Sequence, residues 1–407
     1  MKKRYCIAGA SGRGYEMYAK SIIKDEFKDY AELAGIYDIN IGRSRYVGEH
    51  TGVKVYEDFD VMLATEKPDA VIVTTMDSFH SHYAVRAMKA GFDVIVEKPM
   101  CITAEQAYEM LETEKQTGKH ITVTHNMRYM PYIKAIKQLL YDKKIGDIYN
   151  VHFEWNLVYN GHGTSYFRRW HGVMANSGGL LLTKATHHFD TANWLIDSYP
   201  SKVFAFGAVN KYGNHGGFSG ESCRTCNHKS ECEFYHDFSG DKFVNEFYFA
   251  NEKYDGYIYD GCVFRNNIDA YDTVNLNVLY QNGVTMSYTL NAVAAYEGWR
   301  MVINGSEGRM EIGKIATGDS MSNSDIITLY DMNGHKEVIE ADTAVGVHGG
   351  GDIRLISDII IGRDDDDILH QQATAIDGAA AVLLGAAGNE SIRTGEVIEL
   401  RAFLKKS

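Results

Sequence analysis

Several features of membrane, exported and nucleic-acid-binding proteins are missing from this sequence of 407 residues. It has no run of about 20 apolar residues, so no segment is long enough to span a bilayer. Basic residues are not in excess, and the net charge of −13 argues against nucleic acid or an anionic membrane as the main partner. The basic start, MKKRYCIAGASGRGYEMY, lacks the apolar core of a signal peptide. The cytoplasm is therefore the expected location.

Internal repeats and low-complexity linkers are also absent. With 45% apolar and 23% charged residues, the composition is that of a globular protein. A chain of this length forms roughly two or three domains. In a reducing compartment, the six cysteines are expected to be thiols or metal ligands rather than disulfides.

The hydrophobic pattern changes near residue 126. Before it, short β-rich runs at 4–8, 31–37, 70–75, 93–97 and 121–125 alternate with helical stretches, which predicts a parallel sheet of βαβ units. After it, period-two segments are separated by turn signals such as QNG and NGSEG, which indicates a mainly antiparallel sheet. We therefore predict an α/β domain over residues 1–126, with a doubly wound parallel sheet. An α+β domain with a large mainly antiparallel sheet is predicted over 127–407.

A glycine-rich turn follows the first predicted strand, in CIAGASGRGYEMY. Such a Rossmann-type turn lets the backbone and a helix N-terminus approach a dinucleotide pyrophosphate. Gly9 and Gly14 stand at the first and third glycine places, whereas Ser11 occupies the middle one and is followed by Gly12 and Arg13. The motif alone is weak, because a tight strand–helix turn needs glycine anyway.

An acidic residue ends the second predicted strand, in AGIYDIN. The carboxylate of Asp38 is suitably placed to accept hydrogen bonds from the adenosine ribose, and it would repel a 2′-phosphate. The sequence therefore favours NAD over NADP, although Arg43 lies close enough to soften that preference.

The fifth predicted strand ends in VIVEKPM, and here the chain resembles a known family. A βα-repeat domain ending in Glu-Lys-Pro and followed by an α+β domain is similar to the Gfo/Idh/MocA family of NAD(P)-dependent sugar and polyol dehydrogenases. Further matching segments are TTMDSFHSHYAVRAMKAGFDVIVEKP, THNMRYMP and SGGLLLTKATHHFD. The resemblance covers the first domain nearly throughout, and the second mainly in architecture and in the last of these segments.

The resemblance implies roles for particular residues. Lys98 would reach the nicotinamide and stabilise negative charge on the reacting oxygen, and Pro99 would fix the backbone beside it. His187 falls at the place of the catalytic base. The family usually has an aspartate four residues before this histidine, where this chain has Thr183. Lys184 is then expected to take over part of the positioning, which makes it the third catalytic candidate.

Other candidates border the expected cofactor and substrate. The predicted cofactor-binding set is Gly9, Ser11, Gly12, Arg13, Gly14, Asp38, Arg43, Thr75, His80, Glu97, Lys98 and Asn126. The predicted substrate-binding set is Arg128, Arg168, Arg169, Trp170, His188 and His348. Arginines and an aromatic ring suit sugar hydroxyls and ring faces, but an ion-paired surface loop explains the arginines equally well.

Three cysteines in SCRTCNHKSEC have a C-x2-C-x5-C spacing, and a fourth follows 29 residues later. Cys223, Cys226, Cys232 and Cys262 could hold a structural zinc tetrahedrally. Unconnected thiols in a loop remain the alternative, because no second C-x2-C pair is present.

The sequence favours an NAD-dependent enzyme that moves a hydride between a sugar or glycoside ring carbon and nicotinamide. The first alternative is a hydrolase or lyase in which NAD cycles through transient oxidation, elimination and reduction. The second is a non-catalytic sugar sensor, which would be expected to have lost the lysine or the histidine. Assembly into a homodimer or homotetramer through the C-terminal sheet is also expected.

Overall fold

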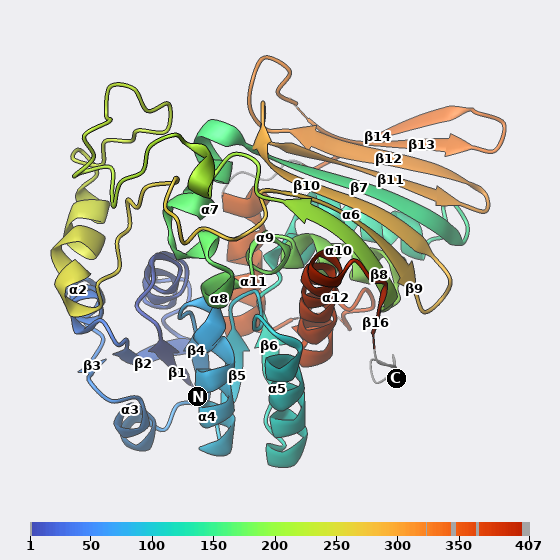
Figure 1. Ribbon diagram of the computed structural model, residues 1–407. Helices are drawn as coiled ribbons and strands as arrows, with labels where there is room; N and C mark the ends of the chain where they lie inside the picture. Colours follow the sequence, from blue (N-terminus) through green and yellow to red (C-terminus); the bar gives the residue numbers. More distant parts are fainter. Residues whose placement is uncertain (1, 323, 343–346, 364–365, 401–407) are drawn as a thin grey trace.

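The computed structural model describes residues 2–322, 324–342, 347–363 and 366–400, and of Val347 and His348 only the backbone. It forms two sheets with helices between and around them (Figure 1). The twelve α-helices of the described residues are α1 (Lys20–Ile22), α2 (Ile41–Thr51), α3 (Phe59–Glu66), α4 (His80–Lys89), α5 (Ala104–Thr117), α6 (Pro131–Tyr141), α7 (Thr164–Arg168), α8 (Met174–Ser177), α9 (Leu180–Thr183), α10 (Thr186–Ile196), α11 (Gly351–Ile360) and α12 (Ala375–Thr394).

The first sheet is parallel except at one edge. Its order is β15 (Ala373–Thr374), β6 (Ile121–Val123), β5 (Asp93–Val96), β4 (Ala70–Val73), β1 (Lys3–Ala8), β2 (Ala31–Tyr37) and β3 (Val55–Tyr56), with β15 antiparallel to β6. Strand β4 is apolar throughout, and every one of its residues is buried, as expected for a parallel sheet covered by helices on both faces. The predicted doubly wound sheet is confirmed.

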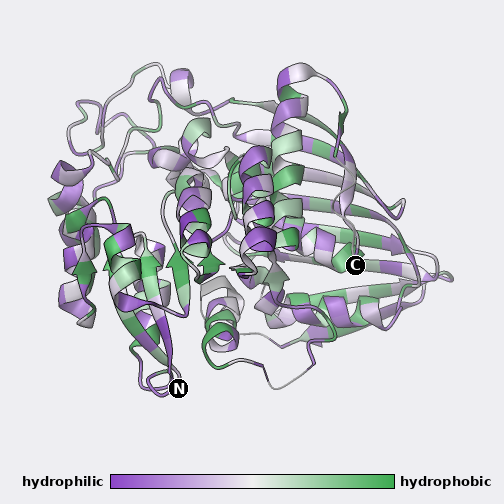
Figure 2. Cartoon of the chain, turned by 90° about the horizontal axis from the view of Figure 1, so that it is seen from below, coloured by the Kyte–Doolittle hydropathy of each residue, from purple (hydrophilic) through white to green (hydrophobic). Residues whose placement is uncertain are grey.

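The second sheet has nine strands in the described part of the chain. Its order is β14 (Lys336–Ala341), β13 (Asp325–Asp331), β12 (Gly308–Ile315), β11 (Gly298–Gly305), β7 (Ile148–Val158), β10 (Thr285–Ala294), β9 (Thr273–Tyr280), β8 (Pro200–Ala208) and β16 (Ile398–Glu399). Only β7 and β10 pair in parallel. Residues of β9 alternate between buried and less buried, so one face packs inward. Figure 2 shows hydrophobic and hydrophilic residues along the same strands. The predicted mainly antiparallel sheet is confirmed.

The two halves share their C-terminal elements. Strand β15 joins the first sheet, and Leu355, Ile356 and Ile360 of α11 belong to the same apolar cluster as β1. The small residues of α12 allow close packing, since a Cβ on Gly385 would lie 2.5 Å from the Leu181 carbonyl oxygen. The boundary predicted at residue 126 stays a prediction, because residues from far beyond it complete the first sheet and its core. No helix of the described residues has the length and apolar character needed to cross a membrane.

Candidate active site

A cavity of about 360 Å³ lies where the carboxyl ends of the first sheet's strands meet the second domain. Its lining comes from the turn after β1, the ends of β2, β4 and β5, the junction of α9 and α10, and two segments near residues 162–171 and 248–257. Parallel α/β sheets bind ligands at this edge. Most of the predicted cofactor and catalytic residues line this single cavity.

The turn after β1 requires its glycines. Gly9 has a φ of +110°, and a Cβ there would lie 2.5 Å from the Thr74 carbonyl carbon. A Cβ on Gly14 would lie 2.5 Å from the Gly9 oxygen. Ser11, at the middle glycine place, accepts a hydrogen bond from the Gly14 N–H at 3.0 Å through its side chain. The serine therefore caps the helical segment η1 (Gly14–Ala19), and the turn keeps its shape without a middle glycine.

The acidic residue after β2 is held firmly. Asp38 accepts hydrogen bonds from the Ala10 and Asn40 N–H groups, both at 2.7 Å, and pairs with Arg43 at 3.2 Å. Arg43 also pairs with Asp255 at 2.7 Å. Burial raises the pKa of Asp38, whereas Arg43 and the backbone donors oppose that rise. The guanidinium that could soften the preference against NADP is thus shared between two carboxylates.

An ionic network lies below the turn. Arg13 donates to Glu97 at 2.9 Å and reaches both oxygens of Asp352, at 2.8 and 2.9 Å. Asn126 donates to the same aspartate at 2.5 Å. Burial acts to raise the pKa of Glu97, but Arg13 and Lys98 hold it below its usual value. Arg13 and Asn126 therefore tie the cofactor turn to α11, and Asn126 does not line the cavity.

His80 connects two cavity loops. Its Nδ1 lies 2.7 Å from the Pro99 carbonyl oxygen and its Nε2 lies 3.1 Å from that of Thr75. Burial lowers the pKa of His80, which favours the neutral ring, and a neutral ring can donate to only one of the two. His80 therefore fixes the loop after β4 against the Lys98–Pro99 peptide, which is cis.

Lys98 meets two residues at the cavity wall. Its Nζ donates to the Thr183 carbonyl oxygen at 3.0 Å. Asp77 is 6% exposed, and the Thr183 side chain lies close enough to favour its charged form. Burial raises the pKa of Asp77 to about 7, although Lys98 and Thr183 oppose the rise. Burial likewise lowers the pKa of Lys98, with Asp77 and Glu97 opposing it.

Residues 180–196 form two helices with a break between them. α9 ends at Thr183 and α10 begins at Thr186, and Lys184 between them has φ −112° and ψ −53°. His187 lines the cavity, with its ring centre 6.5 Å from that of His125. Lys184 therefore lies outside the helix that carries His187 and His188.

His188 instead belongs to the core of the second domain. It is fully buried, stacks on Trp155 at 3.9 Å, and contacts the Tyr288 hydroxyl at 2.6 Å through Nδ1. Lys184 lies over the same tryptophan, with Nζ 4.9 Å from the ring centre. Unlike His188, Lys184 lines the cavity.

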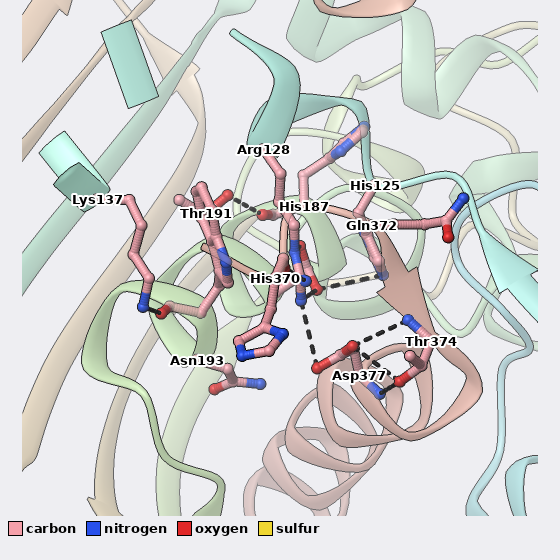
Figure 3. Close-up of polar contacts among 12 residues, drawn as sticks. His125, Arg128, Lys137, His187, Thr191, Asn193, His370, Gln372, Thr374 and Asp377 are labelled. Atoms are coloured by element: carbon pink, nitrogen blue, oxygen red, sulfur yellow. Dashed lines mark hydrogen bonds and ion pairs between the residues drawn. The ribbon is translucent and has the colours of Figure 1, made fainter. Parts of the chain in front are cut away.

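The predicted substrate-binding residues separate into two groups. Arg169 and Trp170 line the cavity, beside Tyr166, His162 and His171. Arg128 is buried instead, where it pairs with Asp190 through two hydrogen bonds of 2.8 and 2.6 Å and approaches Asp377 at 3.5 Å (Figure 3). Arg168 lies behind the wall and donates to Cys223 and Phe234. The side chain of His348 lies outside the described residues.

The four cysteines line one small cavity of their own. The Cys223 sulfur accepts from Arg168 at 2.8 Å, and the sulfurs of Cys226 and Cys262 accept backbone N–H groups. Across the described stretches of chain, no group of three or more His, Cys, Asp or Glu side chains is arranged to hold a metal ion. The predicted structural zinc is therefore not supported by the arrangement of the described residues.

Several cavity residues were not predicted. Asp77 stands in TTMDSFH directly after a parallel strand, and this position was the signal that could have found it. Tyr248 and Asp255 come from the cysteine-containing segment, which has no periodic pattern. The Tyr248 hydroxyl accepts from the Gly12 N–H at 3.1 Å, so this segment reaches the cofactor turn. His162 and Tyr166 lie in a segment that no motif distinguishes.

Comparisons with known proteins agree with this geometry. A family model described as "Oxidoreductase family, NAD-binding Rossmann fold" matches residues 3–125, and a "GFO/IDH/MocA C-terminal domain" model matches 133–311. The chain is 33% identical to the YteT protein of Bacillus subtilis (strain 168), over 94% of each chain. It is 30% identical to the D-glucoside 3-dehydrogenase of Escherichia coli (strain K12), over 29% of this chain and 34% of that one.

Solved structures show the same fold. The WlbA dehydrogenase of Bordetella pertussis, in complex with NADH and UDP-GlcNAcA, has a TM-score of 0.67 at 20% identity, covering 98% of this chain and 99% of that one. The aldose-aldose oxidoreductase of Caulobacter crescentus has a TM-score of 0.64 at 18% identity, covering 98% and 100%.

Proposed function

The chain belongs to the Gfo/Idh/MocA oxidoreductase family, and we propose that it moves a hydride between a ring-hydroxyl carbon of a sugar or glycoside and NAD. The observation that carries the proposal is the convergence of Lys98, Asp77 and His187 on one cavity, which also opens onto the glycine turn and Asp38. A sugar substrate is further supported by the D-glucoside 3-dehydrogenase relative.

The cavity suits a dinucleotide. Gly9 and Gly14 keep side chains away from the turn, Ser11, Gly12 and Arg13 line the cavity, and Asp38 offers a carboxylate to a ribose. NAD bound there supplies the acceptor for the hydride. The residues Arg13 and Glu97 are engaged with one another below the turn, so they shape the floor under the cofactor.

Three side chains carry the chemistry of the substrate hydroxyl. His187 accepts the hydroxyl proton, because a neutral imidazole nitrogen can act as a general base. Lys98 stabilises the negative charge that develops on the same oxygen. Asp77 holds Lys98 and Thr183 in place, and its carboxylate restores the negative charge that the family usually has at position 183.

This assignment differs from the sequence-based expectation for Lys184. The ammonium group of Lys184 lies over Trp155, whereas Asp77 shares Thr183 with Lys98. We therefore give the positioning role to Asp77.

A second candidate function follows from Asp77. Its pKa of about 7 makes it a second proton carrier beside His187, which an NAD-cycling hydrolase or lyase needs. In that reaction, oxidation of the ring acidifies a neighbouring C–H, elimination expels the aglycone, and the ring is reduced again after water has added.

Product analysis decides among the candidates. A panel of sugars and glycosides is incubated with the protein and NAD, and NADH absorbance and product chromatography are followed together. NADH accumulating with an intact, oxidised glycoside supports the dehydrogenase. Release of the aglycone without net NADH supports the cycling reaction. Sugar binding without either product would favour a sensor and contradict both.

Self-association is proposed through the large sheet. Exposed apolar side chains on it include Tyr149, Phe206 and Val338, which are 60%, 67% and 53% exposed. Light scattering is expected to give a dimer or tetramer, and Phe206→Asp to give a smaller species.

A further inference from the structure

Lys184 has no partner in the reaction proposed above. The residue is 6% exposed and lines the cavity. Within the described ranges, its ammonium group makes no ion pair and no hydrogen bond, and its contact is the Trp155 ring at 4.9 Å. A buried charge without a partner is costly, so a ligand that supplies the missing partner would explain it.

The nearby carboxylates are engaged elsewhere. Glu297 pairs with His162 at 2.9 Å and accepts from the Val158 N–H at 2.9 Å. Asp77 interacts electrostatically with Lys98 and with the Thr183 side chain. Burial lowers the pKa of Lys184 to about 8, with Lys98 adding to the effect and Glu297 opposing it, so the group is still an ammonium at neutral pH.

The other cations of the cavity also have tasks. Arg13 and Arg43 are ion-paired, and Lys98 serves the reacting oxygen. Arg169 lies 6.0 Å from the Tyr259 ring, which stacks on Tyr248 at 4.1 Å. Arg169 also donates to the Ser165 carbonyl oxygen at 3.0 Å and to the Ser165 hydroxyl at 3.2 Å, so its guanidinium is held by its own segment. Lys184 is therefore the cation left for a part of the substrate that does not react.

We propose that the substrate is an acidic sugar, a uronic acid or its glycoside, whose carboxylate pairs with Lys184. This inference rests on the proposed function, since it names the substrate class of the same site. One ammonium matches one carboxylate in charge. A phosphate dianion would call for further cationic donors, such as an arginine fork, and among the described residues Lys184 is the one cation over the Trp155 ring.

The test compares matched ligands that differ in the acidic group. Methyl glucoside is compared with methyl glucuronide, and methyl galactoside with methyl galacturonide. The 6-phosphates of the two methyl glycosides form a third set of ligands. Calorimetry with the NAD-loaded protein measures each Kd. The variants are Lys184→Met and, as a matched control, Lys211→Met, whose ammonium lies 5.4 Å from the Phe234 ring and pairs with Glu233 outside the cavity.

In one pair at least, we expect the wild type to bind the uronide about 10- to 100-fold more tightly than the neutral glycoside, as a charge-assisted contact predicts. Lys184→Met should bring that ratio close to one, and Lys211→Met should keep it. The inference would be overturned if the wild type bound the uronide and the neutral glycoside of every pair equally, or bound the 6-phosphate more tightly than the uronide. It would also be overturned if Lys184→Met weakened the binding of both members of a pair by the same factor. Binding of no ligand in the panel would overturn it as well.

The failures of the two proposals differ. Uronide binding that depends on Lys184, without hydride transfer, would leave the inference standing and remove the proposed function. If the protein oxidised neutral sugars and did not bind uronides, the proposed function would stand and the inference about an acidic sugar would fail.

Discussion

At the residue scale, the proposed active site differs from the usual family pattern in the position of one carboxylate. Thr183 stands where an aspartate is usual, and the carboxylate comes instead from Asp77 after β4. The Thr183 hydroxyl and carbonyl connect this carboxylate to Lys98. A threonine at position 183 is therefore compatible with a working site.

Moving the carboxylate back tests this account. Asp77→Asn should lower turnover by about 10- to 100-fold, because Asp77 positions groups that act on the reacting hydroxyl. The affinity for NAD should be unchanged. The double variant Asp77→Asn/Thr183→Asp should recover part of the rate, which a merely structural role would not predict. Stopped-flow NADH formation and NAD titration measure the two quantities.

The pH dependence gives a second readout for Asp77. Its folded pKa of about 7 lies above its ordinary value, so the folded state holds the proton more tightly than the unfolded state. Its contribution to the free energy of unfolding is full at low pH and is lost as pH rises through about 7. Asp77→Asn should therefore gain stability relative to the wild type as pH rises from about 4 to about 7, and should keep that gain at higher pH. If the difference in melting temperature between Asp77→Asn and the wild type did not change with pH, Asp77 would not have the raised pKa that this account gives it.

Asp38 should make the protein prefer NAD. Its carboxylate is fixed by two backbone N–H groups, and Arg43 is shared with Asp255, so a 2′-phosphate would meet uncompensated repulsion. Fluorescence titration should give a lower Kd for NAD than for NADP, and Asp38→Ser should narrow the ratio by about 10-fold. Tighter NADP binding by the wild type would refute the assignment.

At the element scale, the sequence predicts the long periodic elements and misses the short ones. Short apolar runs predict the strands of the first sheet. Alternation of apolar and polar residues predicts the antiparallel strands of the second. β3 and β15 have two residues each, too few for a pattern, and depend on their neighbours. The break between α9 and α10 was also missed. It turns Lys184 toward Trp155, and no helix-breaking residue marks it in LLLTKATHH.

Arg128 was expected at the substrate, but its surroundings were fixed by elements far away in the sequence. The pairing with Asp190 of α10 and Asp377 of α12 appears only once three elements pack together. Asp77 and Thr183 were missed as a pair for the same reason. Motifs placed the individual residues of the site, and tertiary packing decided which of them meet.

The buried pair should contribute strongly to stability. Asp190→Asn should cost about 3–5 kcal/mol, because it leaves the charge of Arg128 undercompensated in the core. The control is Asp60→Asn, which breaks an exposed pair of 2.6 Å with Arg86 and should cost under about 1 kcal/mol. Urea unfolding measures both. If Asp190→Asn and Asp60→Asn lowered the free energy of unfolding by similar amounts, the buried pair of Arg128 and Asp190 would not hold these helices together.

At the scale of the whole molecule, the first sheet carries the proposed cofactor turn, the second domain brings His187 and Lys184, and the two meet at one cavity. The cysteine-containing segment reaches the same cavity through Tyr248 and Asp255. Each domain alone therefore has an incomplete site. Hydride transfer between substrate and nicotinamide is the central claim of this arrangement.

Transfer of deuterium tests that claim most directly. A sugar that the panel has identified as a substrate is deuterated at the carbon that becomes oxidised. It is mixed with the protein and NAD, and the nicotinamide is then analysed by mass spectrometry. The wild type should deliver the deuterium to the nicotinamide ring. His187→Ala should bind NAD normally and transfer at least about 100-fold more slowly, whereas His188→Gln, changed outside the cavity, should transfer far better. Product without deuterium in the nicotinamide, or full transfer by His187→Ala, would contradict the account.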